Sequence, residues 1–414
     1  MPELADLLTP SDARALFARH FTPRPRGTKR VPLTEASGRV LARDIVASED
    51  LPEFDRSTVD GFAVWAGDTS KASKDRPAVL TLVGDVQMGA LPTCVIQPGA
   101  TARIATGGML PEGADAVVML EDVEARDSRT ASVMRPARPG DNVIRRAEDA
   151  KRGEVVLRRG MRLRPQDVGL LAAIGVVEVE VFLKPRVAII VTGDEIVPPE
   201  RKPGAGQVRD VNTYSLTALI QQEGGAPRPY GIVEDTFHVL LRTLADARKN
   251  ADLVLVSGGS SVGAKDEVAR AIGKLGKPGV IVHGVSLKPG KPTILAVVEE
   301  TPIIGLPGHP VSSMVVFDVF VRDLIRGLAG RTPARSLGKV VRARADRRIP
   351  AAGIREDHIR VALEERDGAV WAVPVLGKSG IITTMTKADG VVVVPLGRES
   401  IEQGAEVEVH LFES

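Results

Sequence analysis

The chain has 414 residues, and its 55 Lys and Arg against 53 Asp and Glu give a formal net charge of +2 at pH 7. At about 100–200 residues per domain, this length predicts two to four domains. The one cysteine, Cys94, excludes an intramolecular disulfide framework and a zinc cluster of several thiolates, and it suits a reducing cytoplasm. No apolar run reaches the roughly 20 residues that span a bilayer, and the balanced charge gives no general reason to expect nucleic acid. We therefore expect a cytoplasmic protein with neither a membrane nor a nucleic acid as partner.

The first 183 residues combine short helices with a β-rich stretch. Residues 11–20 predict a helix with Ser11 as N-cap, and a second capped helical piece is predicted from Thr34. Between residues 46 and 147, β-branched runs such as VLTLVGDV alternate with PG, GG and EG turns, which is typical of a small β-rich domain. Residues 148–183 end in a helix-like QDVGLLAAIG and the alternating strand VVEVEVFL.

Residues 126–164 are locally basic, with 12 Arg and Lys against five Asp and Glu. No aromatic side chains are interleaved there to stack on bases. A solvated basic face is the ordinary interpretation of such a segment, and a role facing an anion is the alternative.

A different pattern begins at Arg186. The apolar run RVAIIVTG predicts a buried strand, and NTYSLTALIQQEGG predicts a helix capped by Asn212 and closed by Gly224. Strands and helices then alternate up to TPIIGLPG, and VSSMVVFDVFVRDLIRGL closes the segment as a helix. This alternation predicts a layered α/β domain with a largely parallel sheet.

The C-terminal part changes pattern once more. KVVRARADRRI, HIRVALEE and AVWAVPVL read as strands at short spacing, and Asp367-Gly368 is a hairpin-type turn between two of them. They predict a small β-barrel or sandwich.

In an open α/β sheet, ligands bind beyond the carboxyl ends of the strands. Four strand ends after Arg186 carry Gly-rich or charged loops, and each loop alone also fits an ordinary turn or helix cap. The loops are Thr192-Gly193-Asp194-Glu195, SGGSSVG at 257–263 with Asp266 beyond it, Lys288-Pro289-Gly290-Lys291, and Leu306-Pro307-Gly308-His309-Pro310. Together their glycines and lysines suit phosphates, and their carboxylates suit a divalent ion that holds a phosphate.

The β-rich domain adds two clusters. PEFDRSTVDGFAV at 52–64 places charges and hydroxyls ahead of a strand, with an edge turn at Asp60-Gly61 as the ordinary alternative. In RIATGG at 103–108, Thr106 and the two glycines are placed to form a backbone cradle for an anion.

These motifs together resemble those of the molybdopterin molybdenumtransferases, the MoeA family to which the gephyrin E domain belongs. The resemblance rests on PEFDRSTVDGFAV, RIATGGMLPEGADAVVMLED, VTGDEIV, SGGSSVG with Asp266, LKPGKPT and GLPGHPVSS, in the family's order over residues 52–313. It implies a multidomain α/β plus β fold. Its four expected parts are an elongated N-terminal domain (1–45 and 148–183), an inserted β-rich domain (46–147), a three-layer molybdopterin-binding α/β domain with a largely parallel sheet (184–331) and a C-terminal β-barrel (332–414).

The resemblance also implies an activity. The expected enzyme takes adenylylated molybdopterin and molybdate, uses Mg²⁺, and yields molybdenum cofactor and AMP. Its expected partners are a second copy in a homodimer whose active cleft lies between the subunits, the molybdopterin adenylyltransferase, and the apo-molybdoenzymes. Both substrates are anions, so cations, N–H groups and carboxylates that position them suit this phosphoryl chemistry.

The resemblance further implies roles for the residues that match its motifs. The implied catalytic residues are Asp60, Glu195, Asp235, Asp266, Lys288 and Lys291. Three of them, Glu195, Asp235 and Asp266, would also be metal ligands, while the two lysines would hold the phosphate or the incoming oxyanion. The implied substrate-binding residues are Thr106, Gly107, Thr192, Gly193, Asp194, Ser257, Gly258, Gly259, Ser261, Gly263, Pro307, Gly308, Ser312, Arg360 and Ser379.

The chain departs from the family pattern at several positions. The family usually has Asn where Arg56 and His309 stand, and often Tyr where Glu267 stands. Roles for Arg56 and His309 therefore stay open, and Cys94 is expected to be structural.

Two other functions are weighed against molybdenum insertion. A related α/β enzyme with the same kind of SGG loop adenylylates molybdopterin, but it lacks counterparts of residues 1–180 and 330–414. A non-catalytic scaffold, as in gephyrin, is the other alternative, and the intact Glu195, Asp266 and Lys288 argue against it.

Overall fold

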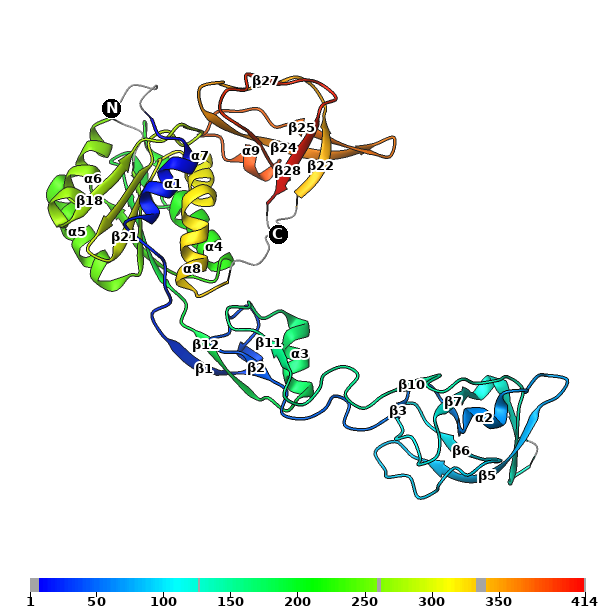
Figure 1. Ribbon diagram of the computed structural model, residues 1–414. Coiled ribbons are helices and arrows are strands. Elements are labelled where there is room, and N and C mark those ends of the chain that lie inside the picture. Colours follow the sequence, from blue (N-terminus) through cyan, green and yellow to red (C-terminus); the bar gives the residue numbers. More distant parts are fainter. Residues whose placement is uncertain (1–6, 126, 259–261, 333–339, 413–414) are drawn as a thin grey trace.

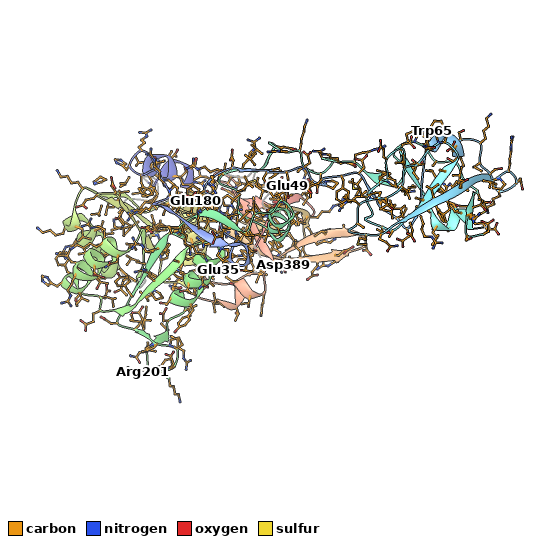
Figure 2. The ribbon with its side chains drawn as sticks, turned by 90° about the horizontal axis from the view of Figure 1, so that it is seen from below. Glu35, Glu49, Trp65, Glu180, Arg201 and Asp389 are labelled. Atoms are coloured by element: carbon orange, nitrogen blue, oxygen red, sulfur yellow. The ribbon has the colours of Figure 1, made fainter. Side chains whose placement is uncertain are left out.

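The computed structural model describes residues 7–125, 127–258, 262–332 and 340–412, and it is elongated (Figure 1). An α/β body and a β-barrel lie at one end, and a β-rich lobe lies at the other, joined to the body by a narrow ribbon. Figure 2 shows Trp65 on the lobe and Arg201 at the lower edge of the α/β body.

The α/β body is built on a six-stranded sheet in the order β16-β13-β17-β21-β20-β18. Only β20 runs against its neighbours within this sheet, so the predicted, largely parallel arrangement is confirmed. β13 and β17 are buried along nearly their whole length, because helices cover both faces of such a sheet. The strands are β13 (Arg186–Thr192), β16 (Ala226–Val233), β17 (Leu253–Gly258), β18 (Pro278–His283), β20 (Ile294–Val298) and β21 (Thr301–Leu306).

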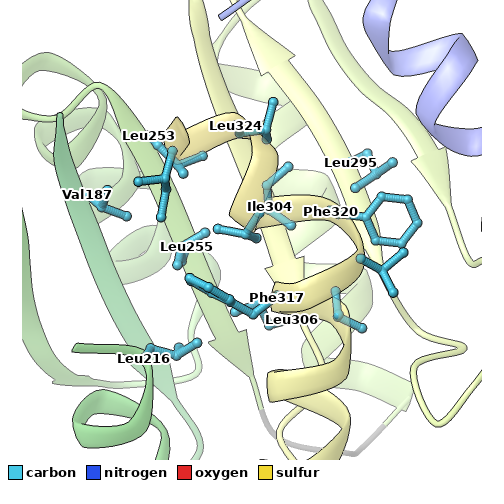
Figure 3. Close-up of a cluster of buried hydrophobic side chains, with 14 of the residues drawn as sticks. Val187, Leu216, Leu253, Leu255, Leu295, Ile304, Leu306, Phe317, Phe320 and Leu324 are labelled. Carbon is cyan, nitrogen blue, oxygen red and sulfur yellow. The ribbon is translucent and has the colours of Figure 1, made fainter. Parts of the chain in front are cut away.

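Two apolar clusters hold helices on the two faces of this sheet. Figure 3 shows one of them, in which Leu255 and Ile304 of the sheet pack with Phe317 of the last helical segment. That segment is helical throughout, but its middle five residues, Phe317–Val321, form a π-helical turn. The helices of the body are α4 (Asn212–Gln222), α5 (Phe237–Asn250), α6 (Val262–Leu275), α7 (Pro310–Val316) and α8 (Arg322–Leu328), with β14 (Ile196–Val197) and β15 (Val208–Arg209) beside them.

The N-terminal helix, α1 (Pro10–Ala18), belongs to the same core. It begins one residue before the predicted start, and Thr9 rather than Ser11 caps it by accepting from the backbone N–H of Asp12. Ala13 and Phe17 are buried in the cluster on the sheet, so α1 packs on the body. The domain boundaries at residues 45, 147, 183 and 331 stay a prediction.

The ribbon is made of β1 and β12, which run antiparallel with Thr28 opposite Phe182. The helical piece predicted from Thr34 is wrong as a helix: only the 3-10 turn Leu33–Glu35 forms, because the chain then turns back to pair with residues near Arg162. The elements here are β1 (Thr28–Pro32), β2 (Ile45–Val46), β11 (Val155–Leu157), α3 (Pro165–Ala173) and β12 (Glu178–Phe182).

The distal lobe is β-rich as predicted and contains a six-stranded sheet in the order β7-β4-β6-β5-β9-β8. Cys94 is half-buried against its core, with Sγ only 2.9 Å from where a Cβ at Gly84 would lie. The elements are β3 (Arg56–Ser57), β4 (Gly61–Val64), α2 (Ala66–Thr69), β5 (Ala78–Val86), β6 (Ala100–Ile104), β7 (Ala116–Met119), β8 (Val123–Ala125), β9 (Thr130–Val133) and β10 (Val143–Ile144).

The C-terminal part closes into a barrel, because β24 pairs with both β25 and β26. Asp367 and Gly368 form the predicted hairpin turn, both with positive φ, 51° and 72°. A short strand of the body, β19 (Leu287–Lys288), pairs with β24 and so joins body and barrel. The barrel elements are β22 (Val340–Ala345), β23 (Ile349–Pro350), β24 (Glu356–Arg366), β25 (Ala369–Pro374), α9 (Thr383–Thr386), β26 (Gly390–Val394), β27 (Ser400–Ile401) and β28 (Glu406–Leu411).

Candidate functional site

The carboxyl ends of four sheet strands meet at one edge of the body. Thr192 at the end of β13 lies opposite both Gly258 of β17 and Val233 of β16, and Ser257 lies opposite Leu306 of β21. The loops that the sequence singled out after these strands therefore start side by side. This is the edge at which open α/β sheets bind ligands.

Carboxylates gather at this edge around Asp235, two residues after β16. Burial above all raises the pKa of Asp235, and the charges of Asp194, Glu195 and Glu267 raise it further. The Thr192 hydroxyl donates a 3.2 Å hydrogen bond to Asp235, which acts in the opposite direction. Asp194, Glu195 and Glu267 therefore place like charge around Asp235.

Four residues of the predicted site, three of them substrate-binding and one a metal ligand, have surroundings outside the description. Gly259 and Ser261 lie outside the described residues. Gly263 and Asp266 belong to α6, but the surroundings of their side chains also lie outside the description. Glu267, noted above only as a departure from the family pattern, is a carboxylate of α6 whose charge raises the pKa of Asp235.

Asn212 ties two of the loops together, a role that the sequence analysis missed. Its Nδ2 donates to Ser257 Oγ at 2.7 Å and to the Gly308 carbonyl at 2.8 Å, and the residue is only 5% exposed. Its Oδ1 is buried without a hydrogen-bond partner. The predicted N-cap role of Asn212 is wrong, because α4 begins at Asn212 itself and Asp210 accepts from the backbone N–H of Thr213.

Cationic side chains line the junction where β19 meets β24. Lys288 Nζ lies 3.0 Å from Oδ2 of Asp357, whose side chain is 2% exposed and whose Oδ1 has no partner. Arg360 is buried, donates from Nη2 to the Gly377 carbonyl at 2.8 Å, and has an unpartnered buried Nε. Burial lowers the pKa of Arg360. Lys291, on the same loop as Lys288, is half-buried.

The start of α7 connects this junction to the sheet edge. His309 Nδ1 lies 2.8 Å from Ser379 Oγ in the barrel, and the backbone N–H of Val311 donates to the Ser379 carbonyl at 3.2 Å. Ser312, in the first turn of α7, is buried. His309, whose role the sequence left open, thus holds a predicted substrate-binding residue of the barrel.

Asp60 and Thr106 come together as a pair in the distal lobe. The backbone N–H and the hydroxyl of Thr106 both donate to Oδ1 of Asp60, at 2.7 and 2.9 Å, and lower its pKa. Gly107 follows with φ 79° and donates to the Ser57 carbonyl. Figure 1 places this lobe far from the sheet edge of the same chain, so one subunit does not unite the two predicted parts of the site.

The basic segment 126–164 is paired in part with aspartates that lie outside it in the sequence. Four of its arginines form ion pairs with aspartates at 2.8–3.6 Å, which favours the interpretation as a solvated, charge-balanced face. The pairs are Arg135–Asp122, Arg145–Asp55, Arg146–Asp50 and Arg164–Asp167.

Two searches of the described residues give negative results. They contain no group of three or more His, Cys, Asp or Glu at metal-binding distances. No helix among them is long and apolar enough to cross a membrane.

The architecture and the sheet-edge site define a multidomain protein with a molybdopterin-binding type of α/β domain. Residues 8–175 match the family described as "MoeA N-terminal region (domain I and II)", residues 188–327 "Probable molybdopterin binding domain", and residues 342–412 "MoeA C-terminal region (domain IV)". The chain belongs to the MoeA family. It is a transferase with a role in molybdenum cofactor biosynthesis.

Individual relatives are similar to this chain over nearly its whole length. The "Molybdopterin molybdenumtransferase" of Nostoc sp. is 35% identical over 92% of this chain and 88% of its own length. The protein of the same name from Bacillus subtilis is 33% identical over 93% and 90%. A crystal structure of a "molybdopterin biosynthesis moeA protein" from Pyrococcus horikoshii OT3 covers 98% of this chain and 100% of its own, with a TM-score of 0.83 and 32% identity.

Proposed function

We propose that this protein inserts molybdenum into adenylylated molybdopterin, using molybdate as the second substrate and Mg²⁺, and releases AMP. The observation that carries the proposal is that an acidic group and a cationic junction lie close to the same edge of the sheet. The carboxylate group around Asp235 suits a divalent cation, and the Lys288–Arg360 junction beyond α7 suits oxyanions. Hydrogen bonds of Asn212 and His309 connect the two regions.

The carboxylate group fits Mg²⁺ by its chemistry. Mg²⁺ prefers carboxylate oxygens and substrate phosphates, and the raised pKa of Asp235 reports crowded negative charge that a divalent cation would relieve. Glu195 and Asp235, with Asp266 from α6, would hold the ion. When bound, Mg²⁺ would neutralise charge on the phosphoanhydride oxygens.

The cations would act on the anionic substrates. Molybdate is a dianion, and binding it requires that charge-assisted donors replace its water shell. Lys288, Lys291 and Arg360 would supply these donors, with the hydroxyls of Ser312 and Ser379. The buried Asp357 holds the Lys288 ammonium at the junction and so positions it before the oxyanion arrives.

The glycine-rich loops at the carboxyl ends of the strands would bind the pterin substrate through their backbone groups. Thr192, Gly193, Asp194, Ser257, Gly258, Pro307 and Gly308 lie at the sheet edge or in the loops directly after it. Asp60, Thr106 and Gly107 would complete the cleft from the lobe of a partner subunit, because their own lobe projects away from the body. The active form would then be a homodimer.

The proposed cellular setting follows from the substrate. A cytoplasmic enzyme of this kind would receive adenylylated molybdopterin from an adenylyltransferase and pass its product to apo-molybdoenzymes.

The test is a direct assay of AMP. Purified protein, adenylylated molybdopterin, molybdate and Mg²⁺ should release AMP, and omission of molybdate or Mg²⁺ should prevent it. Consumption of ATP and molybdopterin without molybdate would instead favour adenylylation. Lack of AMP release, together with rescue of a deficient strain by a Lys288→Ala variant, would favour a scaffold.

A further inference from the structure

A second cavity lies at the opposite edge of the sheet from the candidate site. It has a volume of about 690 Å³ and lies where the β1–β12 ribbon enters the α/β body. Arg186, the first residue of β13, lines it, so the cavity is at the amino end of this strand. The proposed molybdenum chemistry at the carboxyl edge makes no use of it.

The lining carries an excess of positive charge. Five cationic side chains, Arg26, Lys29, Arg39, Lys184 and Arg186, face two carboxylates, Glu35 and Asp252. This leaves three positive charges without an acidic partner in the lining.

The buried carboxylate of Asp252 already binds two of these cations. Its Oδ1 lies 3.1 Å from Arg26 Nη1 and 3.2 Å from Arg186 Nη2, and its Oδ2 accepts from the backbone N–H of Arg186 at 2.7 Å. One negative charge therefore serves two guanidinium groups, and it has no capacity left for the other cations.

Arg39 is the unusual member of the group. It is 8% exposed, yet the one hydrogen bond of its side chain within the described structure runs from Nη2 to the carbonyl oxygen of Phe182 at 2.8 Å. Burial lowers the pKa of Arg39, and only the more distant charge of Glu35 opposes that effect. A guanidinium has five N–H donors, and the remaining guanidinium nitrogens of Arg39 are not enclosed by protein, so they are available to an acceptor in the cavity.

Lys29 and Lys184 line the solvent-exposed side of the same cavity. Both are exposed, and neither forms an ion pair with any residue that the structure describes. Lys29 lies on β1 and Lys184 two residues beyond β12, so the pairing of these two strands brings the lysines to the same end of the ribbon.

We propose that this cavity is a binding site for a small oxyanion with two or more negative charges, in which Arg39 provides the fork and Lys29 and Lys184 the flanking charges. Its volume falls in the range of about 300–1,000 Å³ that is usual for small-molecule sites. The lining that the structure describes has no aromatic side chain, so recognition depends on charge and planar donors rather than on stacking. Phosphate and carboxylate groups both offer the acceptor geometry that this fork matches.

The test measures binding of pyrophosphate and of citrate to the full-length protein by isothermal titration calorimetry at constant ionic strength. These two probes separate phosphate from carboxylate as the preferred group. The titrations use a Lys288→Gln background, so that the oxyanion junction of the proposed active site contributes less and the two proposals can fail separately. The cavity variant adds Lys29→Gln and Lys184→Gln, and the matched control adds Lys71→Gln and Lys74→Gln on the distal lobe.

Saturable binding of at least one probe is expected in the background and control proteins. The cavity variant should bind about tenfold or more weakly, since it loses two charge-assisted interactions. All of these lysines are exposed, so unfolding temperatures without ligand should agree among the variants. Equal affinity in cavity variant and control, or no saturable binding of either probe in the background protein, would overturn the proposal.

Discussion

Asn212→Ala tests whether a single buried amide holds the sheet-edge loops together. The substitution removes the donor that reaches Ser257 at 2.7 Å and the Gly308 carbonyl at 2.8 Å, at a position only 5% exposed. The Gly308 carbonyl would lose this partner, whereas Ser257 keeps a longer contact to the Pro307 carbonyl at 3.5 Å.

The expected cost follows from these contacts. An acceptor or donor left unsatisfied in the interior costs about 1–3 kcal/mol. Gly308 is only part-buried and Ser257 keeps a weak contact, so we count each in part, and the loss of the unpartnered Asn212 Oδ1 offsets some of the cost. The free energy of unfolding should therefore fall by about 1–2 kcal/mol, which lowers the unfolding temperature of a domain of this size by about 2–8 °C.

Calorimetric unfolding and the AMP assay together separate the loss of stability from the loss of activity. The transition of the α/β body should move down in Asn212→Ala, and kcat should fall even at temperatures where the variant is fully folded. Asn212→Asp is the matched control: it keeps the size of the side chain but opposes a carboxylate to the Gly308 carbonyl, and it should be at least as destabilising. If Asn212→Ala changes the unfolding temperature by less than about 1 °C, the amide does not hold these loops.

Three other substitutions test the roles of individual carboxylates. Asp235→Asn should raise the unfolding temperature at pH 7 while abolishing activity, because the raised pKa of Asp235 in the folded protein means that its charged form destabilises the fold. Below about pH 4 the carboxyl is protonated in both states, so this gain in stability should vanish when unfolding is measured there by urea titration. Glu223→Gln, which removes the buried carboxylate that binds Arg322 and Arg326, should cost about 3–5 kcal/mol of unfolding free energy; a loss below 1 kcal/mol in urea titration would contradict this reasoning. Asp357→Asn should raise the KM for molybdate severalfold with little change in kcat, and an unchanged KM would remove Asp357 as the group that positions Lys288.

The sequence predicted the α/β body well because its signals are local. Apolar runs of strand length, helices between them and glycine-rich loops after the strands are all legible within short windows, and parallel pairing then brings the loops to one edge. The pairings that build the site are not local. Asn212 and Gly308 are 96 residues apart, and Lys288 and Asp357 are 69 residues apart. An Asn at the start of a helical pattern was therefore interpreted by its commonest local use, as a cap, and Asp357 gave no signal.

The identity of His309 illustrates how a departure from a family pattern can preserve a contact. In histidine, Nδ1 is bonded to Cγ, as the amide oxygen and nitrogen are in asparagine, so both side chains present a hydrogen-bonding atom at the same distance from the backbone. The 2.8 Å contact of His309 Nδ1 with Ser379 Oγ uses that atom. The imidazole ring extends beyond it, and its Cδ2 lies 3.9 Å from where a Cβ at Gly380 would be, an ordinary van der Waals distance, so the larger ring is accommodated beside the barrel loop. The substitution of His for Asn is therefore compatible with the same link between α7 and the barrel.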